Sequence, residues 1–309
     1  MSHLPNLDST LEHCTVCPHQ CGANRLVGVG RCGVSAQPVV ASVCLHRGEE
    51  PPISGAVGIC NVFFAGCNLR CAFCQNHQIS RCGTVQPHWL TTYTDIANSI
   101  ETCLQQGATA VGFVSPSHQV AQMLRIVAEL HRRGLHPRIV YNSNGFDSPQ
   151  TLRLLEGVVD VYLPDFKYAD NAVALACSGV ERYVETATAA LAEMYRQKGA
   201  SLVLNDNDEA EFGLIVRHLV LPGHIDNSIA ALRLLAERIS PRLHVSLMAQ
   251  YYPPDGLSLG GDLARPLREN EYAAVLAEYN AMGLRGWAQE LSSAQHYRPN
   301  FESESPFNT

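Results

Sequence analysis

Six short apolar segments alternate with longer segments of helical periodicity between residues 55 and 291. The apolar segments centre near residues 60, 112, 140, 160, 217 and 246, and helices are expected at 94–106, 117–133, 150–156, 172–199, 226–239 and 270–282. A further short strand is expected within 286–291. Strands that alternate with helices form parallel sheets through right-handed crossovers. The pattern predicts an α/β fold of six βα units, too few for a closed eight-stranded barrel.

The segments on either side of this repeat are different in character. Residues 1–54 are rich in cysteine and glycine and end in a connector, in which the paired prolines Pro51 and Pro52 argue against regular structure. In this connector we expect His46, Glu49 and Glu50 to be solvated loop residues. Residues 292–309 are polar and are expected to form a mobile tail. The predicted divisions are therefore 1–54, 55–291 and 292–309.

Composition narrows the class of protein. The chain has 309 residues, of which 46% are hydrophobic, and a formal net charge of -7. An acidic balance argues against nucleic acid and anionic membranes as partners, and no apolar run approaches the ~20 residues of a membrane span. Twelve cysteines without an evident secretory signal favour reduced thiols for metals over disulfides. We expect a cytoplasmic protein that binds small molecules or proteins.

Three cysteines follow the first apolar segment at the spacing Cys-x3-Cys-x2-Cys, namely Cys67, Cys71 and Cys74. Thiolates favour iron-sulfur clusters, zinc or copper(I). Three thiolates on a four-iron cluster leave one iron open to a substrate, whereas structural zinc takes four protein ligands. The alternative is a zinc knuckle that takes its fourth ligand from His77 or Cys82.

The cysteine loop resembles the signature of the radical S-adenosylmethionine (SAM) enzymes, with Phe73 as the aromatic residue before the last cysteine. The continuation from Gln75 to Ser80 is similar to the branch that contains the pyruvate formate-lyase activating enzymes. The resemblance implies a partial (β/α)6 barrel and a 4Fe-4S cluster whose open iron binds SAM. It also implies reductive cleavage of SAM to a 5′-deoxyadenosyl radical, which takes a hydrogen atom from the substrate.

A second group of cysteines lies near the N-terminus, at Cys14, Cys17, Cys21 and Cys32. The segment around them is rich in turns and buries little apolar surface, so a metal would supply the missing stability. Four thiolates suit a structural zinc ion and an auxiliary iron-sulfur cluster equally. His13 or His19 is close enough in sequence to replace one thiol.

Polar residues follow the later strands, where parallel sheets place their ligands. Ser115 and Ser117 stand where many family members carry a Gly-Gly-Glu segment. Asn142 and Asn144 lie in a segment similar to the Asp-Thr-Asn-Gly segment of the activating enzymes. The resemblance implies that the polar groups of this segment lie near the ribose of SAM and near a bound monovalent cation. Asn142 replaces the aspartate and puts the cation site in doubt. The alternative for this segment is an ordinary Asn-Gly turn.

The remaining cofactor candidates follow the fourth and fifth strands. Asp165 and Lys167 resemble the Asp and Lys of a Leu-Asp-Ile-Lys segment, although a surface ion pair would look the same. Arg217 lies in a segment similar to Arg-x-Val-x-x-Pro-Gly, and its planar guanidinium suits a carboxylate of the cofactor. We expect His218 to be a packed core residue, and Gln250 and Tyr251 to line the mouth of the substrate site.

These features together predict a radical SAM enzyme that draws electrons from a flavodoxin- or ferredoxin-like donor. Its first predicted substrate is a glycine of a partner enzyme, as in the activating enzymes, and a small molecule or another protein is the alternative. A zinc-stabilised binding protein and an electron-transfer iron-sulfur protein are alternatives of other classes.

Overall fold

The computed structural model describes residues 7–81, 85–295, 298–303 and 306–307. Its strands are β1 (Val40–His46), β2 (Ile59–Phe64), β3 (Ala110–Val114), β4 (Arg138–Ser143), β5 (Val161–Pro164), β6 (Val203–Leu204), β7 (Ala210–Leu219), β8 (His244–Met248) and β9 (Arg285–Ala288). Its α-helices are α1 (Ser9–Glu12), α2 (Pro51–Ser54), α3 (His77–Ser80), α4 (Tyr93–Gln105), α5 (Val120–Arg132), α6 (Pro149–Arg153), α7 (Asn171–Ser178), α8 (Tyr183–Lys198), α9 (Ile225–Arg238) and α10 (Glu269–Ala281). Three 3₁₀ helices complete the set, η1 (Pro116–His118), η2 (Gly261–Ala264) and η3 (Leu291–Gln295).

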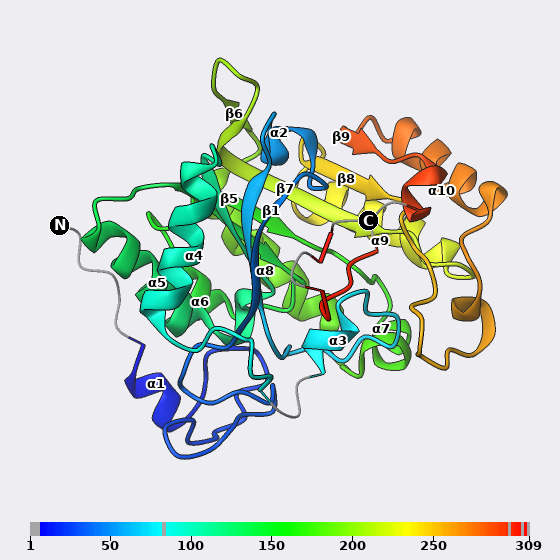
Figure 1. The fold of residues 1–309 in the computed structure, drawn as a ribbon. Coiled ribbons are helices and arrows are strands. Elements are labelled where there is room, and N and C mark those ends of the chain that lie inside the picture. The colour runs from blue at the N-terminus through cyan, green and yellow to red at the C-terminus, as the bar shows by residue number, and fades with distance from the viewer. Residues whose placement is uncertain (1–6, 82–84, 296–297, 304–305, 308–309) are drawn as a thin grey trace.

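The strands form one sheet in the order β1-β2-β3-β4-β5-β7-β8-β9, with β6 paired to β7 (Figure 1). All pairs from β2 to β9 along this path are parallel, whereas β1 runs antiparallel to β2. The six predicted strands are therefore confirmed as neighbours in a parallel sheet, and β9 confirms the additional short strand. Because β1 is antiparallel, its end at His46 lies beside the start of β2 at Ile59.

Side-chain alternation along the strands separates the helix-covered core from the inner face of the sheet. On β4, Ile139 and Tyr141 belong to the large core that the helices complete, whereas Val140 belongs to a separate cluster on the inner face. Helices α4 and α5 pack together, as do α6 with α8 and α9 with α10. The period of two is the strand signature that the sequence pattern carries. Polar residues at the inward positions are consequently free to line a cavity.

Two predicted segments need correction. The expected helix at 172–199 is broken, because α7 ends at Ser178 with Gly179 as its C-cap and α8 begins at Tyr183. The paired prolines do not prevent regular structure, since Pro51 and Pro52 begin the short helix α2. A helix tolerates proline in its first turn, where the missing N–H has no intrahelical partner in any case.

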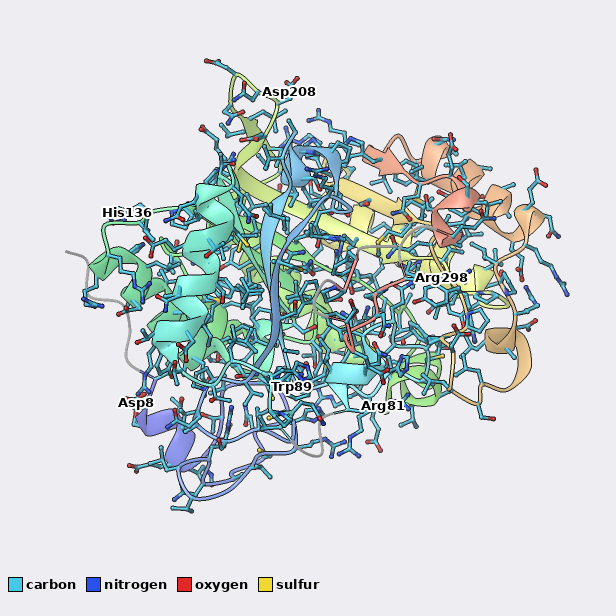
Figure 2. All side chains as sticks on the ribbon, in the orientation of Figure 1. Asp8, Arg81, Trp89, His136, Asp208 and Arg298 are labelled. Atoms are coloured by element: carbon cyan, nitrogen blue, oxygen red, sulfur yellow. The ribbon has the colours of Figure 1, made fainter. Side chains whose placement is uncertain are left out.

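The fifth predicted strand, centred near residue 217, extends back to Ala210 as β7 and forms a hairpin with β6. Figure 2 shows Asp208 at the exposed tip of this hairpin. The tail is also more ordered than its composition indicates. Phe301 is 4% exposed and packs edge-on against Phe63 at 5.1 Å between ring centroids, and Phe307 lies 4.1 Å from the ring of His46. The prediction of a mobile tail is wrong for these two aromatic residues.

Candidate functional site

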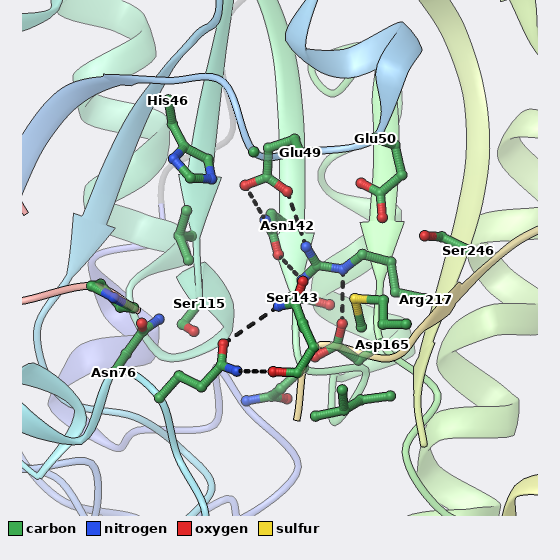
Figure 3. A pocket seen from close by; sticks show the side chains of 18 of the residues that line it. His46, Glu49, Glu50, Asn76, Ser115, Asn142, Ser143, Asp165, Arg217 and Ser246 are labelled. Atoms are coloured by element: carbon green, nitrogen blue, oxygen red, sulfur yellow. Dashed lines mark hydrogen bonds and ion pairs between the residues drawn. The ribbon is translucent and has the colours of Figure 1, made fainter. Parts of the chain in front are cut away.

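A cavity of about 660 Å³ lies on the inner face of the sheet. The three predicted cluster ligands Cys67, Cys71 and Cys74, called the loop thiols from here on, line one end of it. Glu49 and Glu50, which come just before α2, line the other end (Figure 3). Figure 1 places α2 and α3 at opposite ends of the sheet.

Backbone geometry turns the chain sharply at the start of the cysteine loop. Gly66 follows β2 directly and adopts φ 75°, which residues with a side chain rarely adopt. A Cβ atom at this position would also lie 2.6 Å from the carbonyl oxygen of Cys32. The N–H of Gly66 donates to the carbonyl of Ile79, which closes the loop onto α3. Glycine is therefore required where the strand gives way to the loop.

Every loop thiol has a hydrogen-bond donor beside its sulfur. The donors are Leu69 N and Asn144 Nδ2 to Cys67 Sγ at 3.3 and 3.5 Å, Ser178 Oγ to Cys71 Sγ at 2.9 Å, and Ser80 Oγ to Cys74 Sγ at 3.3 Å. Donors of this kind support metal-bound thiolates and tune the potential of iron-sulfur clusters. The donor set therefore fits a thiolate-bound cluster.

The metal-free thiols of Cys67 and Cys71 are protonated at neutral pH. Burial raises the pKa of Cys67 to about 12 and that of Cys71 to about 11. Among the described residues, no three or more His, Cys, Asp or Glu side chains converge as the ligands of one metal ion do. A four-iron cluster holds its ligands farther apart than a single ion does, so the loop thiols need only face the same space, as they do here. Cluster binding must release their protons.

Asn144 braces the cysteine loop. Its side-chain nitrogen donates to Asn68 Oδ1 at 2.7 Å, and Asn68 in turn donates to the carbonyl of Phe146. Gly145 adopts φ 77°, and a Cβ atom there would meet the carbonyl oxygen of Asp165 at 2.0 Å. The segment is thus an Asn-Gly turn that also holds the metal loop in place.

Arg217 is the centre of a charged network inside the cavity. Its Nε donates to Asp165 at 2.9 Å, its Nη1 to Glu49 at 3.0 Å and its Nη2 to Asn142 at 2.6 Å. Lys167 donates to the second oxygen of Asp165. Burial opposes ionisation of Asp165, but Arg217 and Lys167 outweigh it and lower the pKa of this carboxyl. The pair is therefore no surface ion pair, since the side chain of Asp165 is only 12% exposed.

The guanidinium of Arg217 lies between the side chains of residues 142 and 165. The resemblance to the activating enzymes places a monovalent cation near these two positions. Here a protein cation bonds to both, and a neutral Asn142 suits it because Glu49 supplies the further negative charge. Three of the five N–H groups of the guanidinium are used, which leaves two for a ligand.

The connector residues His46, Glu49 and Glu50 are not solvated, and this expectation is wrong. His46 and Glu50 are 9% and 7% exposed, and the side chain of Glu49 is 9% exposed. Pairing of β1 with β2 folds the connector under the sheet and turns both carboxylates inward. No local sequence signal reveals this, because the contacts join residues far apart in the chain.

The two predicted cofactor-binding residues after β3 lie in different environments. Ser115 lines the cavity at φ 54°, whereas Ser117 does not line it and is buried behind the sheet at 2% exposure. The prediction that Ser117 binds the cofactor is therefore corrected. His118 is also buried, and its Nε2 lies 2.9 Å from the carbonyl of Ala65.

The other predicted residues fall near the cavity or in the core as follows. Phe73 lines the cavity with its ring 6.0 Å from that of Tyr251. Gln250 lines it and bonds to Gln75, whereas Tyr251 is buried behind it. His218 is fully buried with Nδ1 2.6 Å from the carbonyl of Phe166, which confirms it as a core residue.

The N-terminal thiols, Cys14, Cys17, Cys21 and Cys32, surround a space of only about 10 Å³. His19 lines the same space, and its Nε2 lies 2.7 Å from the carbonyl of Asn68 in the cysteine loop. Burial raises the pKa of Cys17 to about 12. The four thiols thus line one small space, although they do not converge as the ligands of a single metal ion do, and the second metal site stays a prediction. The alternative ligand Cys82 lies outside the described residues.

Comparison with known proteins agrees with this site. The model of the radical SAM superfamily matches residues 61–235, which is more than half of the chain. An uncharacterized protein of Methanocaldococcus jannaschii is 30% identical over 277 residues, covering 87% of this chain and 75% of that protein. The chain belongs to the radical SAM superfamily. Membership implies a 4Fe-4S cluster and SAM as cofactors, and radical redox chemistry as the type of reaction.

One solved structure shows a similar fold at low identity. Streptococcus suis SuiB bound to its precursor peptide SuiA aligns with a TM-score of 0.50 at 10% identity, over 76% of this chain and 49% of SuiB. The chain thus spans about half the length of SuiB. A domain of pyruvate-formate lyase-activating enzyme from Bacteroides vulgatus aligns with a TM-score of 0.35 at 13% identity, over 55% of this chain and 93% of that domain. Within the described residues, no helix is long and apolar enough to cross a membrane.

Proposed function

We propose that Cys67, Cys71 and Cys74 hold a 4Fe-4S cluster and that the chain uses SAM to abstract a hydrogen atom from a substrate in the cavity. The observation that supports this most is the position of the loop thiols. They open onto a 660 Å³ cavity, which lies within the ~300–1,000 Å³ typical of ligand sites. A purely structural metal site has no use for such a space.

When bound, the cluster supplies the electron that cleaves SAM into methionine and a 5′-deoxyadenosyl radical. The chain's own residues then have binding and positioning roles. Arg217 offers its two unused N–H groups to the SAM carboxylate, and Lys167 has two of its three donors free of Asp165. Asn142, Ser115 and Phe73 line the space where the rest of the cofactor would lie.

Asn144 acts on the loop rather than on substrate. Because it donates to Cys67 and to Asn68, it fixes the first ligand against the end of β4. Asp165 holds Arg217 and Lys167 in place through both carboxylate oxygens. These are positioning roles, and the reducing electron would come from a flavodoxin- or ferredoxin-like donor.

Installation of a glycyl radical on a partner enzyme is the first proposed reaction, and hydrogen abstraction from a small molecule or another protein is the second. The second is favoured by the polar groups that line the cavity besides the loop thiols, among them Glu49 and Glu50, which lie across it from Asn76 (Figure 3). A glycine residue has no side chain to use such groups.

The test is anaerobic reconstitution with iron and sulfide, followed by reduction with dithionite and measurement of 5′-deoxyadenosine. Wild type should form it, and Cys71→Ala should not. Cys44→Ala is the matched control because Cys44 is a half-buried cysteine of β1 outside the cavity. Stoichiometric zinc in place of iron at the loop would support the binding protein instead. A stable cluster that leaves SAM intact would support the electron-transfer protein.

A further inference from the structure

Glu50 lies at the end of the cavity opposite the loop thiols. It immediately precedes α2, and the antiparallel pairing of β1 with β2 brings it beneath the sheet. Figure 3 shows its carboxylate pointing into the cavity toward Arg217, with Ser246 across from it. Its position therefore places an acid deep in the site, away from the cluster.

The backbone at Glu50 is held firmly. Its carbonyl accepts hydrogen bonds from the N–H groups of Ile53 at 2.8 Å and Ser54 at 3.0 Å. Pro51 and Pro52 restrict the backbone of the first turn of α2. The carboxylate consequently points inward from a rigid support and not from a mobile loop.

The two neighbouring acids differ in how their oxygens are used. Both oxygens of Glu49 are occupied, by Asn61, Asn142 and Arg217. Glu50 is only 7% exposed, yet its Oε2 has no hydrogen-bond partner among the described residues. Burial raises the pKa of Glu50, and the nearby charge of Arg217 offsets this only in part.

A buried carboxyl oxygen without a hydrogen bond destabilises the fold, because it loses its contact with water and gains no partner. Folded proteins pair nearly all buried polar groups, so exceptions tend to have a function. The cationic groups nearby do not pair with Glu50, because Arg217 bonds to Glu49 and Asp165 and Lys167 bonds to Asp165. The hydroxyl of Ser246 is a hydrogen-bond donor beside the Glu50 carboxyl, but Oε2 has no partner among the described residues, so a ligand in the cavity can supply the missing donor.

The surroundings indicate which donor fits. Three acids line the cavity, Glu49, Glu50 and Asp165, and so do three bases, Arg47, Arg217 and Lys167. Arg47 is exposed and donates to the carbonyl of Val57, and the other two bases pair with Glu49 and Asp165. Among the described residues that line the cavity, Glu50 is therefore the acid without an ion pair, and a positively charged group would supply one. On β8, Ser246 is in register with Arg217 on one side and Trp287 on the other. Trp287 lines the cavity, and an indole face attracts cations. A cationic nitrogen donor would therefore meet charge, hydroxyl and aromatic groups at this end.

We propose that Glu50 binds an ammonium group of the substrate. The proposal rests on the proposed function, since it assigns a substrate class to the same cavity. The hydrogen atom to be abstracted would lie toward the loop thiols, and the ammonium group would hold the far end of the substrate. Substrates of this class include free amines and lysine side chains.

The experiment uses two probes of equal size, n-pentylammonium and n-pentanol, added to the reconstituted protein with SAM present. Binding is followed by tryptophan fluorescence, because Trp287 lines the cavity. We expect wild type to bind the ammonium probe at least about 10-fold more tightly than the alcohol, as for ~1.4 kcal/mol of preference. Trp287→Phe should remove the fluorescence response. Equal affinity for the two probes in wild type would overturn the proposal.

Glu50→Gln tests the acid directly, since it keeps the size of the side chain and removes the charge. The variant should lose the preference for the ammonium probe, whereas Glu211→Gln, at an exposed position of β7, should keep it. A preference that survives in Glu50→Gln would contradict the proposal. A fall in the melting temperature of Glu50→Gln of several degrees would instead assign Glu50 a structural role.

The outcome is separable from that of the proposed function. Probe binding needs no SAM cleavage, and cleavage by wild type needs no probe. Selective binding of the ammonium probe without formation of 5′-deoxyadenosine would contradict the proposed enzyme activity but support the ammonium site at Glu50. Cleavage of SAM together with equal affinities for the two probes would support the enzyme activity and contradict the ammonium site.

Discussion

The loop thiols face a cavity of about 660 Å³, whereas the N-terminal thiols surround a space of about 10 Å³. Both groups of thiols are partly buried. The two segments that carry them touch where the ring of His19 contacts the carbonyl of Asn68. A metal with three protein ligands and an open space beside it can bind a substrate, while one enclosed by four ligands mainly stabilises the fold. The difference between the two groups therefore lies in free space and ligand number, and not in the residue type.

The largest expected contrast concerns the ligands themselves. Cys71→Ala should lower 5′-deoxyadenosine formation by more than about 100-fold, beyond the 10–100-fold typical of losing an outer hydrogen-bond partner. The reason is that the remaining two thiols cannot hold the cluster. Iron analysis together with the SAM cleavage assay measures both effects. Retention of activity with full iron content would break the assignment of the loop thiols.

The matched change in the N-terminal group should act on stability. Cys17→Ala removes a buried thiol of the predicted second metal site and should lower the melting temperature, because structural metal sites supply folding free energy directly. SAM cleavage per loop cluster should stay within about twofold of wild type, since structural and catalytic sites are separable. Loss of one zinc per chain would identify a zinc site, and loss of four irons an auxiliary cluster. Abolished cleavage at an unchanged melting temperature would contradict a structural role.

Each group of thiols has a buried arginine near it, Arg217 in the cavity and Arg25 beside the N-terminal thiols. Arg217→Ala should raise the KM for SAM by about 10–100-fold, the size expected for one charged hydrogen bond. Arg25 is 1% exposed and donates to the carbonyls of Ser35 and His118, so Arg25→Ala should lower the melting temperature with little change in KM. Steady-state kinetics and thermal denaturation separate the two. Identical effects of both substitutions would show that Arg217 has only a structural role.

The position of Arg217 also predicts the response to salts. Wild type should cleave SAM equally well with and without added potassium, because the guanidinium already bonds to residues 142 and 165. Arg217→Ala vacates that space, and potassium should restore part of its activity. The rate measured against potassium concentration, at constant ionic strength with choline as control, decides this. A wild type that requires potassium would show that the guanidinium does not take the place of the cation.

The smallest expected effect concerns the hydrogen bond from Ser178 to Cys71. Removing it in Ser178→Ala should lower the reduction potential of the cluster by about 40 mV, which corresponds to ~1 kcal/mol for one electron. A donor stabilises the more negative, reduced state, so its loss favours the oxidised one. Redox titration followed by electron paramagnetic resonance measures the shift. Ser240→Ala, a buried serine outside the site, should give none.

Prediction from sequence succeeded where the signal is local. Strand and helix positions follow from hydrophobic periodicity, and the carboxyl ends of parallel strands bring Asn142, Asp165 and the thiol-bearing loop to one cavity. The residues that carry long side chains into the cavity, such as Arg217, were indicated by their motifs. Ser117 was misplaced, because the left-handed turn at Ser115 moves the residues after it behind the sheet.

Prediction failed where burial depends on distant pairing. Glu49 and Glu50 stand in a polar, proline-containing segment, and only the pairing of β1 with β2 and the reach of Arg217 bring them inside. Phe301 and Phe307 were overlooked for the same reason, since their contacts with Phe63 and His46 cross most of the chain. The break after Ser178 was readable in principle from Gly179 as a helix C-cap.

The most direct test of the central claim is whether SAM binds to the cluster of the loop thiols. The reduced protein would be examined by electron paramagnetic resonance before and after addition of SAM, with Cys71→Ala as control. An open iron beside the cavity predicts that SAM changes the spectrum of wild type, and that Cys71→Ala lacks the signal. A wild-type cluster whose spectrum is unchanged by saturating SAM would contradict the account.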